Sequence, residues 1–199
     1  MIRSPVMLAL LLVLGVASPC EAITGANVSL GHYYLQPNTP NQTIPIYVSG
    51  GAQVSGLNFN LQMGDGGPEV GGTPGPVFTS LDLTNNTIFQ YDFSDPVDTG
   101  SVPQLLTWYV LTQNAGDHVA ADGLLATATI DTTGYSDRTW SLDISDTLNG
   151  PTNFTDGGTI PATLIDGLIT VVPEPSSIAL FLAGCGGLAV MSWRRGKRK

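Results

Sequence analysis

Apolar and polar residues alternate along the middle of the chain with a period of two, which is typical of β-strands that bury one face. The clearest run covers residues 57–63, where Leu57, Phe59, Leu61 and Met63 share one face and amide side chains share the other. No apolar period near 3.6 residues is sustained in this part of the sequence. The pattern therefore predicts an all-β domain.

Further runs of this kind are spaced as in a sandwich of short strands, which predicts two packed antiparallel sheets. Residues 105–111 are apolar on both faces, so we expect a central strand there with Trp108 in the core. The pair Asp166-Gly167 is expected to form a bulge or tight turn within the last strand. The Gly- and Pro-rich residues 64–76 predict a long exposed loop. About nine strands are expected, at residues 28–35, 44–48, 57–63, 77–83, 88–93, 105–111, 124–131, 140–145 and 161–172.

The first 22 residues have the three parts of a secretory signal peptide. Arg3 supplies the positive charge, residues 6–16 are apolar, and a small-residue segment ends at Ala22, after which cleavage is expected. Acylation of Cys20, as in a lipoprotein, is the alternative, although the preceding proline is unusual for such a site.

Residues 172–199 also divide into three parts. Residues 176–193 carry no charge and are just long enough for a transmembrane helix. Pro173 and Pro175 stop that helix from starting earlier. The end of the chain is basic and is expected to stay in the cytoplasm. Its basic residues are Arg194, Arg195, Lys197, Arg198 and Lys199.

The segment Val172-Pro173-Glu174-Pro175, placed directly before a Gly-rich apolar helix, resembles the PEP-CTERM sorting signal of bacterial surface and matrix proteins. This resemblance implies that the protein stays in the inner membrane only transiently. It implies further that an exosortase cuts at or near the motif, and that residues 23–171 are exported to the cell surface or extracellular matrix. An ordinary single-pass anchor would have the same helix and basic end, and is the alternative.

The exported residues 23–171 are strongly acidic. They contain 14 Asp and Glu residues and a single base, Arg138, for a net charge of −13 with neutral histidines. Nucleic acid is not expected as a partner, because phosphate binding needs a basic surface. Both cysteines, Cys20 and Cys185, fall outside this domain, so no disulfide is expected in it.

Three segments of the exported part are similar to cohesin-type domains. Residues 42–61 resemble the first strands of that family, residues 122–130 its "D-G-x-L-A" strand, and residues 160–171 its closing strand. The resemblance implies a nine-stranded jelly-roll sandwich, related in shape to carbohydrate-binding modules. Cohesins bind dockerins through one sheet face. After Met63 this chain departs from the family, because it continues with Gly-Asp-Gly-Gly in place of a "Y-D-P"-like turn.

Two groups of residues are candidates for ligand binding. Asp92, Asp95 and Asp98 recur at every third residue, and calcium is the cation that such oxygen ligands in an irregular loop would take. Solvated turn residues are the alternative explanation for these aspartates. Tyr47 and Tyr109 fall on outward strand positions, so they are candidates for an aromatic face that binds sugar.

Catalysis is not expected from this sequence. Only His32 and His118 could act as a base in a triad, His118 follows an aspartate in a loop, and no Gly-x-Ser-x-Gly segment occurs. We therefore expect a non-enzymatic surface or matrix protein whose β-sandwich serves adhesion or contact with another surface protein. The alternative function is a carbohydrate-binding module that acts on exopolysaccharide.

Overall fold

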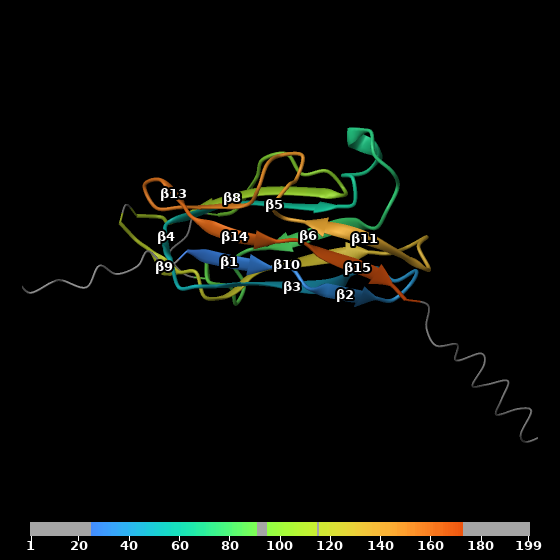
Figure 1. The fold of residues 1–199 in the computed structure, drawn as a ribbon, viewed down its shortest axis with the longest axis horizontal. Helices are drawn as coiled ribbons and strands as arrows, with labels where there is room; N and C mark the ends of the chain where they lie inside the picture. Colours follow the sequence, from blue (N-terminus) through green and yellow to red (C-terminus); the bar gives the residue numbers. More distant parts are fainter. Residues whose placement is uncertain (1–24, 91–94, 115, 173–199) are drawn as a thin grey trace, which may run out of the picture.

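The structure is a computed structural model that describes residues 25–90, 95–114 and 116–172, which form a sandwich of two packed sheets (Figure 1). The all-β fold predicted from the alternating pattern is thereby confirmed. The predicted signal peptide (1–22), transmembrane helix (176–193) and basic end (194–199) lie outside the described residues. Within the described ranges, no helix combines the length and apolarity needed to cross a membrane.

The first sheet has five strands in the order β14-β1-β3-β10-β6. β3 and β10 pair along most of their length, from Gln42 opposite Ile130 to Val48 opposite Gly123, with a bulge near Leu125. The strands are β1 (Ala26–Ser29), β3 (Gln42–Ser49), β6 (Val77–Asp82), β10 (Gly123–Asp131) and β14 (Ala162–Ile165).

The second sheet has eight strands. Its main path is β13-β12-β5-β11-β15-β2, and β8 pairs with both β5 and β7. The strands are β2 (His32–Leu35), β5 (Gly56–Met63), β7 (Val97–Asp98), β8 (Leu105–Leu111), β11 (Arg138–Asp143), β12 (Asn153–Thr155), β13 (Thr159–Ile160) and β15 (Gly167–Val171). A two-stranded ribbon, β4 (Gln53–Val54) with β9 (Val119–Ala120), and a 3-10 turn, η1 (Pro68–Val70), complete the described elements.

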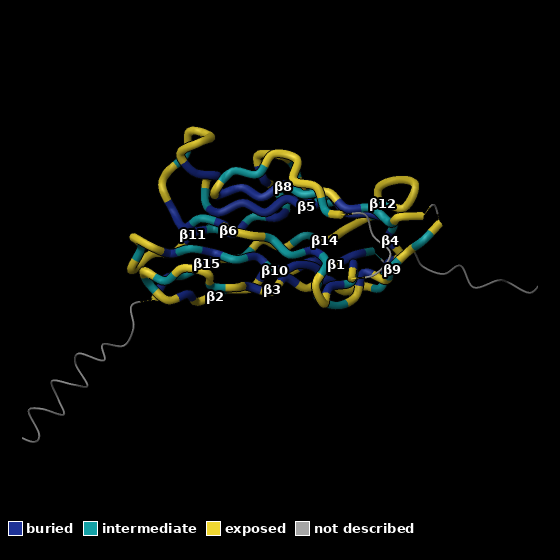
Figure 2. The backbone as a smooth tube through the Cα atoms, turned by 180° about the vertical axis from the view of Figure 1, so that it is seen from behind, coloured by how far each residue is buried: buried dark blue, intermediate teal, exposed yellow. Residues whose placement is uncertain are grey.

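Inward-facing side chains of the two sheets form one continuous core. Figure 2 marks the buried residues along the strands in dark blue. The alternation in β3 and β5 is confirmed, since the apolar set of each strand is buried. Trp108, predicted to lie in the core, pairs with Phe59 across β5 and β8; it packs against the core but is only partly buried. The fully buried set from these strands is Ile44, Ile46, Leu57, Phe59, Leu61 and Met63.

The outer face of β5 is also covered, although its side chains are polar. Asn60 is 0 % exposed and Gln62 is 6 % exposed. The Thr152 hydroxyl donates a hydrogen bond to the backbone carbonyl of Asn60, and the Leu148 N–H donates to the side-chain Oε1 of Gln62 at 2.8 Å. A loop therefore lies over this part of the sheet and pairs with the Gln62 amide, whereas Oδ1 of Asn60 has no hydrogen-bond partner among the described residues.

The first and the last strand of the domain each pass from one sheet to the other. The chain leaves the first sheet after β1 and enters the second at β2, and it does the same between β14 and β15 (Figure 1). β1 pairs with β14 and β2 pairs with β15, both in parallel. The prediction of purely antiparallel sheets was therefore wrong for these two pairs. The predicted strands 28–35 and 161–172 are two strands each, which is one reason why the structure has more strands than the nine predicted.

The pair Asp166-Gly167 is the point of this crossing and not a bulge within a single strand. Leu168 N–H donates to the Gly31 carbonyl at 3.1 Å, and a Cβ on Gly167 would lie 2.4 Å from that carbonyl oxygen. Only glycine allows the two crossing segments to approach so closely. The Asp166 carboxylate accepts hydrogen bonds from Ile144 N–H at 2.7 Å and from Ser145 N–H at 2.9 Å.

Two other strand predictions need correction. Residues 88–90, predicted to begin a strand, form a turn that buries Phe89, while residues 91–93 lie outside the described residues. The strand at 105–111 is not central, because its outer neighbour is only the two-residue β7. The outer face of β8 is covered by a loop instead, from which Asn149 Nδ2 donates a hydrogen bond to the Thr107 hydroxyl at 2.7 Å.

Replacing Asp166 by alanine should destabilise the domain by about 1–2 kcal/mol, because Ile144 N–H loses its acceptor and Asp166 is itself partly exposed. Chemical unfolding of the full chain measures the change. Asp166→Asn keeps one acceptor oxygen and should lose less. Asp137→Ala, an exposed aspartate in the turn after β10, is the control and should stay within about 0.5 kcal/mol. An equal loss in the Asp166 and Asp137 variants would show that the crossing does not depend on this carboxylate.

Candidate functional site

A shallow groove of about 500 Å³ lies on the surface where the first and last strands change sheets. Its floor is formed by the crossing segments around Gly31 and Gly167, and its walls come from β2, β11 and β15. The walls include His32, Leu168 and Asp143. The groove exists because the two crossings lie side by side, so its shape follows directly from the fold.

An exposed aromatic and aliphatic surface borders this groove. The rings of His32 and Tyr34 stack with centroids 4.4 Å apart and an interplanar angle of 25°. Tyr34 is 67 % exposed and Leu168 is 42 % exposed. His32 is paired with Leu168 in the parallel register of β2 and β15, so these side chains share the outer face of the second sheet.

Hydrogen bonds between three strands hold the aromatic pair in place. The hydroxyl groups of Thr139 on β11 and Thr170 on β15 are joined at 2.7 Å, and the Thr170 hydroxyl is joined to Nε2 of His32 at 2.7 Å. The Tyr34 hydroxyl lies 3.4 Å from Nδ1 of the same ring. Both ring nitrogens of His32 are therefore engaged, and the stack is fixed before any partner arrives.

Two carboxylates in the groove have opposite pKa shifts. Partial burial raises the pKa of Asp143, and the nearby Asp166 and Asp146 carboxylates raise it further, against a hydrogen bond from Ser141. Partial burial also raises the pKa of Asp166, but the hydrogen bonds from Ile144 and Ser145 outweigh it and leave that pKa lowered. The groove thus holds a carboxylate that a partner cation would stabilise, beside one already satisfied by the protein.

The structure does not bring the two predicted ligand-face tyrosines together. Tyr47 is 58 % exposed and Tyr109 is 37 % exposed, so both outward assignments agree with the structure. Tyr47 lies on β3 of the first sheet and Tyr109 on β8 of the second, and outward side chains of the two sheets face away from each other. They cannot form one aromatic platform.

The predicted calcium ligands are only partly described. Asp92 lies outside the described residues, and Asp95 is exposed. The Asp98 carboxylate accepts hydrogen bonds from Gly100 N–H at 3.0 Å and Ser101 N–H at 2.8 Å, which closes a turn after β7. No group of three or more metal-ligating side chains occurs in the part of the chain that the structure describes. A calcium site at these aspartates remains a prediction.

His118, considered above as a triad base, is paired with an aspartate from a distant loop. Its Nε2 lies 2.7 Å from Oδ1 of Asp156, at a partly exposed position that joins the loop before β9 to the loop after β12. Asp117, which precedes it, accepts a hydrogen bond from Asn114. The side-chain hydrogen bond to Asp156 raises the pKa of His118 above its ordinary value of 6.5.

The His118–Asp156 pair should make stability depend on pH. A histidine with a raised pKa in the folded state contributes stability that is fully present below about pH 6.5 and is lost as the pH rises through the folded pKa. We expect His118→Gln to lower the melting temperature at about pH 6 and to have little effect at about pH 9. Asp156→Asn should behave in the same way, and the double variant should lose no more than either single one. A difference that does not change with pH would contradict the ion pair.

The sequence did not identify His32, Tyr34 and Leu168 as parts of one binding surface. Tyr33 and Tyr34 are adjacent, so alternation alone placed one of them outward, but nothing local identified its neighbours. Leu168 and His32 are 136 positions apart and meet only through the parallel pairing of the first and last strands. The sequence signal for this surface is that each crossing has a glycine, Gly31 or Gly167, directly before an outward residue, His32 or Leu168.

A family profile described as the PEP-CTERM protein-sorting motif matches residues 171–198. This match confirms the sorting motif predicted from Val172, Pro173, Glu174 and Pro175, of which only Val172 is among the described residues, where it is exposed. The motif implies processing by an exosortase, export and sorting to the cell surface. No curated protein matches the chain with significance.

Several solved cohesin structures are similar to the described domain. The third cohesin of ScaC from Acetivibrio cellulolyticus, solved in complex with the ScaB dockerin, has a TM-score of 0.53 at 16 % identity, covering 74 % of this chain and 99 % of that one. The seventh ScaB type I cohesin from Pseudobacteroides cellulosolvens gives 0.54 at 14 % identity, covering 77 % and 96 %. CaCohA2 from Clostridium acetobutylicum gives 0.53 at 16 % identity, covering 75 % and 92 %. The chain therefore combines a cohesin-like β-sandwich with a PEP-CTERM sorting motif at its C-terminus.

Proposed function

We propose that this protein is a non-enzymatic component of the bacterial cell surface or extracellular matrix, which contacts another surface protein through the groove between β2, β11 and β15. The observation that carries the proposal is the exposed stack of the Tyr34 and His32 rings beside Leu168, which hydrogen bonds already hold in place. This surface belongs to a cohesin-like sandwich in a chain with a sorting motif. Exposed aromatic and aliphatic side chains that are held in place are typical of the anchors of protein interfaces.

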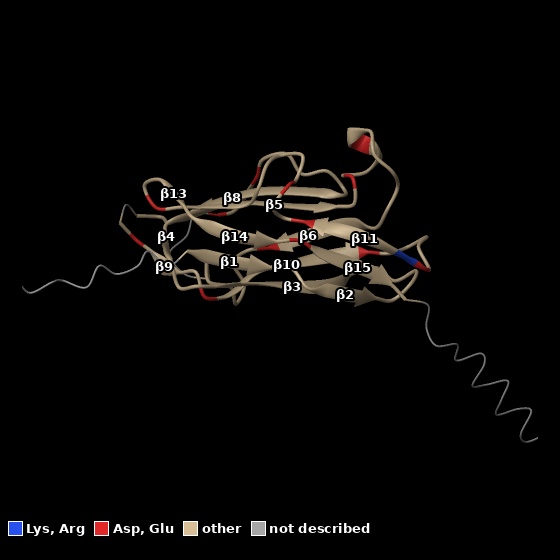
Figure 3. Ribbon diagram, in the orientation of Figure 1, with Lys and Arg blue, Asp and Glu red and all other residues tan. Residues whose placement is uncertain are grey.

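The charge of the domain indicates the chemistry of the partner. Acidic side chains are spread over its loops and strands, and the one base among the described residues is Arg138, whose guanidinium lies 6.0 Å from the Trp140 ring (Figure 3). In the groove, the raised pKa of Asp143 means that a nearby cation would be favoured. The partner surface should therefore present apolar side chains next to lysine or arginine.

The proposed role needs no catalytic group. His32 is hydrogen-bonded to Thr170 and His118 to Asp156, and no serine in the described ranges is within hydrogen-bonding distance of either histidine. A sugar-binding face made of Tyr47 and Tyr109 is disfavoured because the two side chains lie on different sheets. Protein contact through the groove is the function that these arrangements favour.

The boundaries of the mature protein belong to the same proposal. We propose that residues 1–22 are removed on export, that residues 23–171 form the exported domain, and that the exosortase removes the apolar helix 176–193 with the basic end 194–199. The described strands begin at Ala26 and end at Val171, so both proposed cuts fall outside the sandwich.

Changing Pro173-Glu174-Pro175 to three alanines should leave the full-length chain in the inner membrane, because the processing enzyme would lose its motif. Intact-mass measurement of the surface form and of the membrane fraction decides the outcome. The unchanged protein should appear at the surface without residues 176–199. A full-length C-terminus on the surface form would show that the tail is an ordinary anchor.

A photo-reactive residue placed at Leu168 should give one discrete protein adduct on intact cells, because this position lies at the centre of the proposed contact. The same group placed at Tyr47, exposed on the other sheet, is the matched control and should give none. Asp143→Lys in the Leu168-labelled protein should remove the adduct by opposing the cationic partner. Equal adducts from both positions, or an adduct unaffected by Asp143→Lys, would contradict the proposed face.

A further inference from the structure

The outer edge of β2 is a row of backbone groups without a neighbouring strand. β2 is the last strand of the second sheet, and its pairing partner is β15. Leu168 N–H donates a hydrogen bond to the Gly31 carbonyl, which fixes the side on which the ladder bonds form. Because successive residues of a strand form these bonds on opposite sides, the N–H and C=O groups of His32 and Tyr34 point away from β15.

These outward groups have no hydrogen-bond partner among the described residues. An edge of this kind is a template for another strand, and most domains protect it with a charge, a proline or a bulge. β2 reads His-Tyr-Tyr-Leu, and its register with β15 is regular along its whole length. The edge of β2 therefore carries none of these protections.

The edge also lies in a part of the domain that has no charged residue. All 14 acidic residues of the exported part are at position 65 or later, and its single base is Arg138, so β1, β2 and β3 contain neither sign of charge. In Figure 3 these three strands are tan. Two copies of a domain with a net charge of −13 repel each other, and an uncharged edge is where they can approach with the least repulsion.

The positions of the outward residues make this edge complementary to itself. His32 and Tyr34 lie one on each side of Tyr33. A two-fold axis at Tyr33 would place His32 of one copy opposite Tyr34 of a second copy, in an antiparallel pair. Residues that face each other in this way exchange both N–H···O=C bonds. Every outward N–H and C=O group of the edge would then have a partner.

The side chains at these positions match as well. The rings of His32 and Tyr34 already stack on one copy, with centroids 4.4 Å apart. In the two-fold arrangement each ring gains a ring of the other kind as its cross-strand neighbour, at about 4.5–5.5 Å between Cβ atoms. The two stacks would join into one row of aromatic side chains on the outer face, which is a favourable kind of cross-strand contact.

Two other sheet edges in the described ranges offer less to a second copy. On β14 the same alternation directs the backbone of Ala162 and Leu164 outward. A two-fold pair there would place alanine opposite leucine, and the strand is followed by the Asp166 carboxylate. The edge of β6 is partly covered, because Phe78 N–H donates to the Pro103 carbonyl.

We propose that two copies of this domain pair antiparallel through the edges of β2, with Tyr33 of each copy at the two-fold axis. The second sheets of the two copies would join into one sheet, and both grooves would open on the same face of it. This interface goes beyond the protein contact proposed for the groove and does not depend on it, since it uses the backbone of the edge and leaves Leu168 and Asp143 uncovered.

The short edge makes this a weak interface in dilute solution, in the size class of transient contacts. Copies that are concentrated on a cell surface or in a matrix need no more than that, because a high local concentration compensates for low affinity. Salt at physiological strength also screens the remaining repulsion between the two copies beyond about 8 Å. The pairing is therefore expected on cells and should be tested there.

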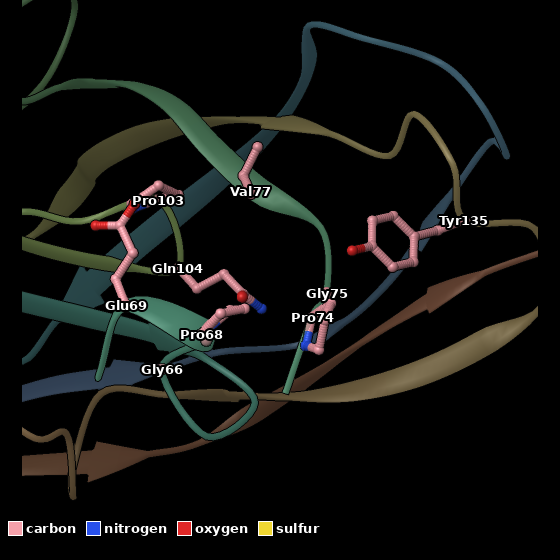
Figure 4. Close-up of a pocket in the computed structure, with 10 residues that line it drawn as sticks. Gly66, Pro68, Glu69, Pro74, Gly75, Val77, Pro103, Gln104 and Tyr135 are labelled. Atoms are coloured by element: carbon pink, nitrogen blue, oxygen red, sulfur yellow. The ribbon is translucent and has the colours of Figure 1, made fainter. Parts of the chain in front are cut away.

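The pocket under the Gly- and Pro-rich loop 64–76 is separate from this edge. It has a volume of about 240 Å³, and Pro74, Gly75, Gln104 and Tyr135 are among the residues that line it (Figure 4). No residue of β2 is among them. The partner that the edge of β2 fits is thus a strand that pairs with backbone groups, and not a small molecule held in this hollow.

Replacing Tyr34 by p-azidophenylalanine in the full chain tests the pairing on intact cells, because the new side chain keeps the shape of the tyrosine ring. Illumination should give an adduct of twice the mass of the mature chain. The linked residue should be His32 of the second copy or one of its immediate neighbours. The same group at Tyr47, 58 % exposed on β3, is the matched control and should give no such adduct.

The absence of a double-mass adduct from position 34 would overturn the proposal. A link to a distant part of the second copy would overturn it too, because the two-fold register allows only residues near His32. An equal yield of double-mass adduct from position 47 would show that the copies meet without using a particular edge, with the same consequence.

Two variants of His32 separate the backbone from the side chain. His32→Ala and His32→Pro both lose the imidazole, but only the proline variant also loses the outward N–H, and proline is tolerated in an edge strand whose N–H faces solvent. In the chain labelled at position 34, the alanine variant should keep a reduced yield of the double-mass adduct, and the proline variant should lose the adduct. Equal yields from the two variants would overturn the backbone pairing. The mapped register does not depend on whether the proline variant folds.

Asp143→Lys distinguishes this pairing from the contact proposed for the groove. It should remove the adduct formed from Leu168 and leave the double-mass adduct from position 34 unchanged, because Asp143 lies on β11 and not on the edge. Loss of the double-mass adduct in this variant would show that the copies meet through the groove, and would overturn the edge pairing. A double-mass adduct from position 34 without any adduct from Leu168 would support the edge pairing and contradict the groove contact alone.

Discussion

The paired crossing of the first and last strands is the constraint on which the rest of the domain depends. Gly167 has no side chain, which lets its backbone approach the Gly31 carbonyl closely, and Asp166 ties the crossing to the start of the loop after β11. Because both strands change sheets together, each sheet gains one parallel pair, and the two sheets are joined along one side of the sandwich. The groove is the outer surface of that joint, so the candidate contact face is a direct product of the topology.

The acidic residues of the domain work mainly as acceptors for its own turns. Asp65 and Asp131 accept hydrogen bonds from Thr73 and Thr133, and these hold the pKa of both carboxyls below the ordinary value of 3.8. Partial burial raises the pKa of Asp98 and of Asp166, yet the bonds they accept leave both lowered. Such groups stabilise the fold above about pH 4 and cease to do so as the pH falls through the lowered pKa. These four aspartates thus serve to close turns in a lysine-free domain.

Local patterns in the sequence predicted what depends on neighbouring residues and missed what depends on distant ones. Alternation in β3 and β5 identified the buried sets correctly, and the sorting motif was recognisable because it is contiguous. The crossing at Gly31 was missed although the inward positions change phase there, from Val28 and Leu30 to Tyr33 and Leu35. Such a shift over a few residues does not show which sheet a strand belongs to. The burial of Asn60 and Gln62 depends on a loop about 90 positions away. The burial of Gln104 likewise depends on loop 64–76, where Gly67 and Gly75 lie against its amide.

The direction of the crossing strands also determines how the domain would respond to mechanical force. β1 begins at one end of the long axis, and β15 ends at the other, immediately before Val172 (Figure 1). Because β1 and β14, and likewise β2 and β15, run parallel, a pull between these two ends would strain both sets of hydrogen bonds in shear, all at once. Strands that are loaded in this way do not peel apart one bond at a time. A domain retained at its C-terminal end and gripped at the far end would therefore transmit tension along its length while its core stays closed.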